Sequence, residues 1–199
     1  MYEMVRFLSI IIFRVFFRMK VEEAEFIPLD APFIVVANHD SLLDGFVLVS
    51  AISRRINFLS AAHLFEISFV GWFLAKMGAI PVRKKGQNFG SLKKALEVLN
   101  RNGVLGIFPE GGINDNNIYS GATYLAVKSG VPILPVAILG AHKALPPGKK
   151  WPRLTPIKVK IGRLVSTSRK ERLTHKYLEE ETKLLKQILI SLRDDKGFC

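Results

Sequence analysis

Short apolar runs alternate with helical patterns along most of the chain, and this alternation constrains the fold more than any other feature. Six runs rich in aliphatic residues predict strands at 33–37, 56–60, 79–82, 104–108, 133–138 and 157–161. Helical patterns lie near 42–52, 89–100, 121–129 and 171–193. The pattern predicts an α/β fold: a single domain with a mixed, largely parallel central sheet whose strands are covered by helices on both faces.

The N-terminal segment has a different composition from the rest of the chain. Residues 4–20 contain no acidic residue and combine bulky apolar side chains with four cations, Arg6, Arg14, Arg18 and Lys20. Such a helix, about 25 Å long, suits a membrane interface, where arginines reach headgroups and aromatic rings enter the acyl boundary. We therefore expect residues 1–20 to form a membrane-associating helix. A helix that packs on the protein's own core is the alternative.

A second apolar stretch, 64–80, is consistent with either a buried helix or a second interfacial one. With 199 residues, of which 49% are hydrophobic, the chain is long enough for one well-buried core. No stretch approaches the 18 or so uninterrupted apolar residues of a spanning helix. We expect a protein that contacts a membrane without a conventional span, peripheral or monotopic on the cytoplasmic face of the cell membrane.

Positive charge is concentrated in one part of the chain. The formal net charge is +12, and residues 116–170 contain no Asp or Glu. Ten basic residues lie there: Lys128, Lys143, Lys149, Lys150, Arg153, Lys158, Lys160, Arg163, Arg169 and Lys170. This favours an anionic partner such as membrane phospholipid or a phosphorylated substrate. Nucleic acid is not expected, because the basic residues alternate with apolar residues more than with base-stacking aromatics, and no helix-turn-helix, zinc-finger or RNA-recognition signature is present.

Neither a disulfide framework nor a metal site is expected. The chain has a single cysteine, Cys199, and His63, His142 and His175 have no partner at metal-ligand spacing. We therefore predict no metal and no cofactor, and these histidines are expected to be surface or packing residues.

The segment NHDSLLD, residues 38–44, carries the best indication of chemistry. It follows an expected buried strand and holds His39 and Asp44 five residues apart. On a regular helix the two side chains would lie roughly 140° apart, so they meet only if a turn precedes a helix that begins around Asp40 or Ser41. His39 then acts as a base whose tautomer Asp44 fixes. A helix-capping segment without catalytic function is the alternative interpretation.

Four segments in order resemble the PlsC-like glycerolipid acyltransferases. They are NHDSLLD at 38–44, GAIPVR at 78–83, FPEG at 108–111 and VPILPVA at 131–137. The resemblance covers residues 31–141, more than half of the chain, and implies that 21–199 form an acyltransferase domain. It implies transfer of a fatty acyl group from acyl-CoA or acyl carrier protein to a lysophospholipid, most simply 1-acylglycerol-3-phosphate, giving phosphatidic acid.

The resemblance also assigns roles to residues. His39 takes the proton of the acceptor hydroxyl and Asp44 orients it, without a covalent intermediate. Backbone amides near 110–112 or at the helix start after His39 are candidate donors to the oxyanion. Predicted substrate-binding residues are Arg83, Lys84, Glu110, Gly111 and Gly112, with Lys85 as a further phosphate cation. Asn38, Ser41 and Pro109 are predicted to support the site.

Two departures from the family pattern concern the acceptor. Members commonly continue the third motif as Glu-Gly-Thr-Arg-Ser, whereas this chain has EGGIN at 110–114. Tyr119 replaces a basic residue common shortly before the next glycine. Two cations near the phosphate are thus missing, and loop cations such as Lys143, Lys149 or Lys150 are possible replacements. An acyltransferase for an acceptor without phosphate and a catalytically silent lipid-binding module are the alternatives.

Overall fold

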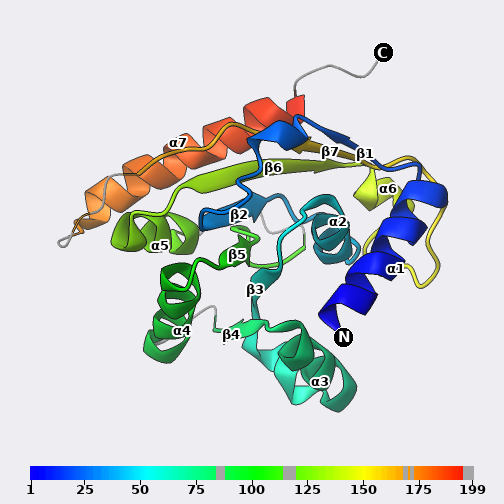
Figure 1. Ribbon diagram of the computed structural model, residues 1–199, viewed down its shortest axis with the longest axis horizontal. Coiled ribbons are helices and arrows are strands. Elements are labelled where there is room, and N and C mark those ends of the chain that lie inside the picture. Colours follow the sequence, from blue (N-terminus) through cyan, green and yellow to red (C-terminus); the bar gives the residue numbers. More distant parts are fainter. Residues whose placement is uncertain (84–87, 114–119, 168–169, 171–172, 195–199) are drawn as a thin grey trace.

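The structure, a computed structural model, describes residues 1–83, 88–113, 120–167, 170 and 173–194. A seven-stranded sheet forms its centre (Figure 1), in the order β1-β7-β6-β2-β5-β3-β4. The strands are β1 (Lys20–Glu22), β2 (Phe33–Ala37), β3 (Ile56–Ala61), β4 (Ile80–Val82), β5 (Val104–Ile107), β6 (Ile133–Leu139) and β7 (Lys158–Ile161). All neighbouring pairs are parallel except β6 and β7. The predicted mixed, largely parallel sheet is confirmed.

Helices cover both faces of the sheet (Figure 1). On one face, α1 (Tyr2–Val15), α2 (Asp44–Ala51), the short α6 (Ala141–Ala144) and the 3₁₀ turn η1 (Ala24–Phe26) share a core with the sheet. On the other, α4 (Phe89–Asn100), α5 (Gly121–Ser129) and α7 (His175–Asp194) form a second core. The 3₁₀ segment η2 (Ala62–Glu66) and α3 (Ser68–Met77) lie between β3 and β4 in the chain.

Strand β2 is central and shows why its sequence is apolar throughout. All five of its residues are buried. Phe33 and Val35 belong to the core beneath α1 and α2, whereas Ile34 and Val36 belong to the core beneath α4, α5 and α7. Successive side chains of a strand point to opposite faces, so a strand covered on both faces has no polar position.

The N-terminal helix is shorter than expected. It ends at Val15, and Lys20, expected as its last residue, lies in β1. The chain leaves the helix through Arg18, whose φ of 45° lies in the left-handed region. The Lys20 amide then donates to the carbonyl of Ile157, which starts the pairing of β1 with β7.

One side of the N-terminal helix packs on the protein, and the other side is exposed and apolar. Tyr2, Ser9 and Phe13 are buried against the protein, as a core-packing helix requires. An opposite set of large apolar side chains is exposed: Met1, Met4, Phe7, Leu8, Ile11, Ile12, Val15 and Phe16. No helix among the described residues is long and apolar enough to cross a bilayer.

Residues 64–80 contain a helix that is not buried. In and beside α3, Ile67, Phe69 and Trp72 are exposed, while Gly71 and Met77 are buried. Of the two alternatives that the sequence left open, a fully buried helix is excluded by these exposed side chains, and an interfacial role stays a prediction. Three of its large apolar side chains are exposed, and the others are half-buried or buried.

Three short elements, β1, η1 and α6, were not anticipated, and helix α2 begins late. Strand β1 and helix α6 have three and four residues, too few for a periodic pattern. Helix α2 begins at Asp44 instead of Asp40 or Ser41. The reason is local: the amides of Asp40 and Ser41 both donate to the Asp44 carboxylate, so the segment forms a turn around that side chain.

Candidate active site

The loop after β2 brings His39 and Asp44 together. His39 Nδ1 lies 3.0 Å from Asp44 Oδ2, and the amides of Asp40 and Ser41 each donate to the same oxygen at 2.8 Å. The turn therefore does what a regular helix could not, as the spacing predicted. Because the carboxylate only accepts, Nδ1 carries the ring proton and Nε2 is the acceptor of the neutral imidazole.

Asp44 is held in an unusual environment for a carboxylate. Its side chain is fully buried, and among the described residues Oδ1 has no hydrogen-bond partner. Burial raises the pKa of Asp44, and the hydrogen bonds from His39, Ser41 and Asp40 oppose that rise. All three donors meet Oδ2, so this oxygen is the one that orients the imidazole.

The His39 ring is also fixed by an aromatic stack. It lies 4.1 Å from the Phe108 ring at an interplanar angle of 15°, and Phe108 in turn stacks on Phe58 at 5.9 Å. Phe58 pairs with Gly106 of β5, and a Cβ added at Gly106 would lie only 2.6 Å from the Phe58 ring. A glycine at 106 is thus needed for the ring that supports the stack.

Glu110 joins the third motif to the first. Its Oε2 accepts the backbone amide of His39 at 3.0 Å, across 71 residues of sequence. The carboxylate stands in a turn in which the Gly111 amide donates to the Phe108 carbonyl and Gly111 takes a φ of 66°. Burial raises the pKa of Glu110, as does the Asp40 charge, whereas the His39 amide and the Arg193 charge lower it. Glu110 therefore holds the backbone of His39 in place.

Two predicted supporting residues anchor the loop to its surroundings. Asn38 accepts from the Ile138 amide at 2.8 Å and donates to the Ile138 carbonyl at 3.0 Å, which extends the contact between β2 and β6 by one step. The Ser41 hydroxyl is fully buried and donates to the Leu145 carbonyl at 2.9 Å. Ser41 is thus committed to the fold and is not placed as a nucleophile.

The other predicted residues lie at or beyond the edge of this arrangement. Pro109 is buried directly before Glu110. Gly112 follows the turn, close to the undescribed residues 114–119. Arg83 is exposed and directly follows β4. Strand β4 lies three positions from β2 in the sheet, so the two strands are about 14 Å apart. Lys84 and Lys85 lie outside the described residues.

Several amides proposed as oxyanion donors already have partners. Those of Asp40 and Ser41 donate to Asp44, that of Asp44 donates to the Ser41 carbonyl, and that of Gly111 donates to Phe108. Within the part of the chain that the structure describes, no three His, Cys, Asp or Glu side chains are grouped as metal ligands. What this site offers is an imidazole oriented by a buried carboxylate, beside a charged pocket.

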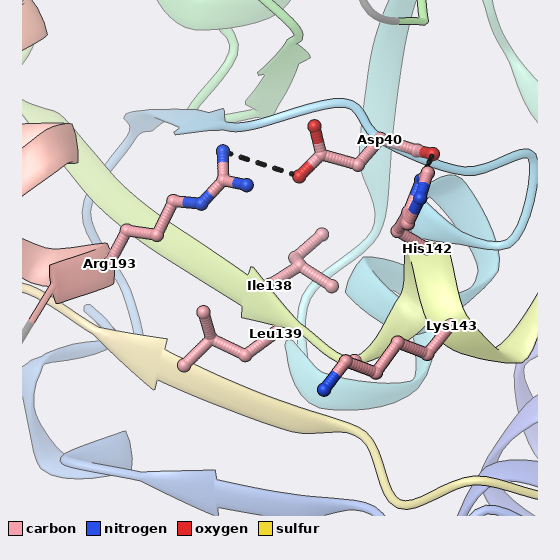
Figure 2. Close-up of a pocket in the computed structure, with 7 residues that line it drawn as sticks. Asp40, Ile138, Leu139, His142, Lys143 and Arg193 are labelled. Carbon is pink, nitrogen blue, oxygen red and sulfur yellow. Dashed lines mark hydrogen bonds and ion pairs between the residues drawn. The ribbon is translucent and has the colours of Figure 1, made fainter. Parts of the chain in front are cut away.

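Sequence reasoning missed that pocket, which adjoins the loop at the carboxyl end of β6. It has a volume of about 270 Å³ and is lined by Asp40, Gly140, His142, Lys143, Arg193 and the last residues of β6. Figure 2 shows Arg193 paired with Asp40, at 3.5 Å, and His142 at the Asp40 carbonyl. Asp40 precedes Arg193 by more than 150 residues, so no local pattern indicates that they meet. The acid-free stretch around Lys143 was the only signal.

Comparisons with known proteins agree on one family. A family model described as Acyltransferase matches residues 18–139. The 1-acyl-sn-glycerol-3-phosphate acyltransferase LPAT1, chloroplastic, of Arabidopsis thaliana is 30% identical over 142 residues, which are 68% of this chain and 40% of that protein. The 1-acyl-sn-glycerol-3-phosphate acyltransferase of Bacillus subtilis is 27% identical over 146 residues, 72% of this chain and 71% of its own.

A solved structure is similar over the whole chain. The crystal structure of the 1-acyl-sn-glycerophosphate (LPA) acyltransferase PlsC from Thermotoga maritima matches with a TM-score of 0.74 and 27% identity, covering 100% of this chain and 80% of that one. The chain spans only about 40% of the length of the two chloroplast relatives it matches, from Arabidopsis thaliana and Brassica napus.

Proposed function

The chain belongs to the acyltransferase family, whose model covers residues 18–139, and on that premise we propose that it acylates the free hydroxyl of 1-acylglycerol-3-phosphate to give phosphatidic acid. The acyl donor is a thioester, acyl-CoA or acyl carrier protein, used as a substrate, with no further cofactor. The observation that carries this proposal is the 3.0 Å contact of His39 with the buried Asp44 at the end of β2. Relatives that bear this activity in their names match 68% and 72% of the chain.

The proposed reaction follows from the tautomer of His39. Nε2 takes the proton of the acceptor hydroxyl while the hydroxyl oxygen attacks the thioester carbonyl, and Asp44 stabilises the imidazolium that forms. The tetrahedral intermediate then collapses, its carbon–sulfur bond breaks, and His39 returns the proton to the leaving thiolate. No residue of the chain becomes acylated, which agrees with a loop whose serine is buried and bonded to Leu145.

The oxyanion of the intermediate requires hydrogen-bond donors near the third motif. Since the amides of Asp40, Ser41 and Gly111 have intramolecular partners, we assign this role to the amides of Glu110 and Gly112. Glu110 acts through the His39 backbone and keeps the first and third motifs in register. Arg83 remains a proposed phosphate ligand at the edge of the site, and Lys84 is a second one.

The exposed face of α1 supports attachment to a membrane surface. One side of the helix is buried against the protein, and the other presents a continuous apolar set with Phe7 63% exposed. Arg14, Arg18 and Lys20 are exposed at its C-terminal end, suited to anionic headgroups. We propose that the helix lies flat in the interface on the cytoplasmic face, so that a lysolipid delivers its hydroxyl to the site from the bilayer.

The attachment is tested by point variants, because deletion of residues 1–20 would remove Phe13 and Phe17 from the core. The pair of substitutions Phe7→Glu and Ile11→Glu places charges on the exposed face. Sedimentation with anionic vesicles should fall, while Leu29→Glu, which charges an even more exposed apolar position elsewhere, should sediment like wild type. Unchanged sedimentation of the α1 pair would place the anchor outside this helix.

The acceptor is tested by a panel of lysolipids that differ only in headgroup. Purified protein in detergent is given a labelled acyl donor with lysophosphatidic acid, lysophosphatidylcholine or monoacylglycerol, and product formation is measured by thin-layer chromatography. We expect turnover to be fastest with lysophosphatidic acid. Preference for monoacylglycerol would favour the second candidate, an acceptor without phosphate, which the missing third-motif arginine supports. Binding without turnover of any acceptor would indicate a silent lipid-binding module.

A further inference from the structure

The pocket beside Asp40 is shaped for a small anionic group. Its volume of about 270 Å³ corresponds to roughly nine water molecules, enough for a headgroup but small for a whole lipid. Its floor is apolar, formed by Ile138 and Leu139 at the end of β6, and its rim is charged. The pocket lies at the carboxyl edge of the sheet, where sites of α/β proteins form.

Positive charge enters this pocket from two elements far apart in the sequence. Arg193 extends from the last turn of α7, and Lys143 extends from α6 on the opposite side (Figure 2). His142 adds a third nitrogen-bearing side chain. Among the residues that line the pocket, Asp40 is the one carboxylate, so its negative charge is outweighed by the positive charges of Arg193 and Lys143.

The Asp40 carboxylate does not oppose an anion as a free charge would. Its Oδ2 accepts the Asn38 amide at 2.8 Å and faces Arg193 at 3.5 Å. A guanidinium has five N–H donors in a planar fork, so one loose contact with Asp40 orients the group and leaves further donors for an anion. Arg193 is about half exposed, which leaves it accessible.

The pocket is directly coupled to the proposed base. Asp40 follows His39 in the chain, and its amide donates to Asp44, the orienting carboxylate. The charge of Arg193 also acts on Glu110, which accepts the His39 amide. A group bound between Arg193 and Lys143 would therefore lie beside Asp40, the residue that follows His39 in the loop.

We infer that this pocket binds the phosphate group of a substrate, with Arg193 and Lys143 as its ligands. The inference rests on the proposed function and deepens it, because it supplies cations that the third motif lacks. These residues lie beyond the segment 18–139 that the family model matches. The phosphate belongs either to the lysolipid acceptor or to the phosphopantetheine arm of the donor, and arginine–phosphate pairing is the shared chemistry.

Binding is measured first, without turnover. Phosphorus NMR titrations with glycerol 3-phosphate and, separately, with coenzyme A report the two possible sources. We expect Arg193→Gln and Lys143→Gln to weaken binding of one of them about tenfold, since hydrogen bonds to charged groups are worth that much. Arg193→Lys should retain part of the affinity. Lys186→Gln, the same loss of charge at an exposed position of α7, should bind like wild type.

Three results would overturn the inference: no saturable binding of either probe by wild type, equal affinities for wild type and both pocket variants, or an equal loss in Lys186→Gln. Kinetics then separate binding from positioning. A phosphate ligand raises KM for its substrate at unchanged kcat, whereas a fall in kcat alone would mean that Arg193 acts only by positioning Asp40. Phosphate binding that depends on Arg193 in a protein without acyl transfer would refute the proposed function and leave the pocket standing.

Discussion

Replacement of Asp44 by asparagine is expected to remove a charge without changing the geometry of the dyad. Asp44 Oδ2 accepts two backbone amides besides His39 Nδ1. Because backbone amides can only donate, the asparagine must place its oxygen at that position and its NH₂ group where Oδ1 now stands. His39 then keeps its proton on Nδ1 and its free Nε2. What Asp44→Asn loses is the negative charge beside the imidazolium.

The size of that loss follows from the distance. With the nitrogen and oxygen 3.0 Å apart, the charge centres of the two groups are about 4 Å apart. At an effective dielectric constant of about 20 this attraction is about 4 kcal/mol. If the imidazolium exists only from the transition state onward, the rate falls by about 10³-fold.

The assay is the initial rate of phosphatidic acid formation from a labelled thioester and lysophosphatidic acid at saturating acceptor. Asp30→Asn, which makes the same chemical change at an exposed carboxylate before β2, serves as the control and should leave the rate unchanged. Circular dichroism and thermal unfolding establish that both variants fold. A kcat of Asp44→Asn within tenfold of wild type would refute the electrostatic role of Asp44.

Three further predictions concern stability. Gly106→Ala places a Cβ 2.6 Å from neighbouring side chains and should lower the free energy of unfolding, measured in urea, by about 1–3 kcal/mol. Gly90→Ala, in a helix with open space around the added Cβ, should raise it by about 0.5–1 kcal/mol. Equal effects of the two substitutions would contradict the crowding at Gly106. Asn38→Ala leaves the buried backbone amide and carbonyl of Ile138 without their side-chain partner. It should lower the free energy of unfolding by about 2–4 kcal/mol. A loss under 1 kcal/mol would show that water replaces the Asn38 side chain. Burial raises the pKa of Glu110, so the folded protein binds this proton more readily than the unfolded chain does. The wild type therefore loses stability as the pH rises through that pKa, and the free energy of unfolding of Glu110→Gln relative to wild type should increase from about pH 4 to pH 7. A decrease would contradict the effect of burial.

The sheet could be predicted from sequence because its strands are buried on both faces. A run such as 33–37 is apolar at every position, and its observed bounds agree with the prediction. Helices with a regular amphipathic pattern, such as 89–100, were equally clear. Strand β1 could not be found in this way, because it has three residues and is held by β7, more than 130 positions away.

The site was predictable only where its parts are close in sequence. The meeting of His39 and Asp44 follows from a spacing of five residues and a turn. The bond from the His39 amide to Glu110 and the approach of Arg193 to Asp40 depend on how the sheet and α7 pack. The phenyl ring of Phe108 looks like a core residue in the sequence, and only the structure places it against the imidazole.

The central claim is that His39 is the base that deprotonates the acceptor hydroxyl. Its most direct test compares initial rates of acyl transfer by wild type and His39→Ala, at saturating thioester and lysophosphatidic acid, with thermal unfolding measured on the same preparations. The account predicts a kcat lower by about 10²–10⁴-fold in a variant that is still folded, the range expected for loss of a general base. Equal rates for the two proteins would contradict it.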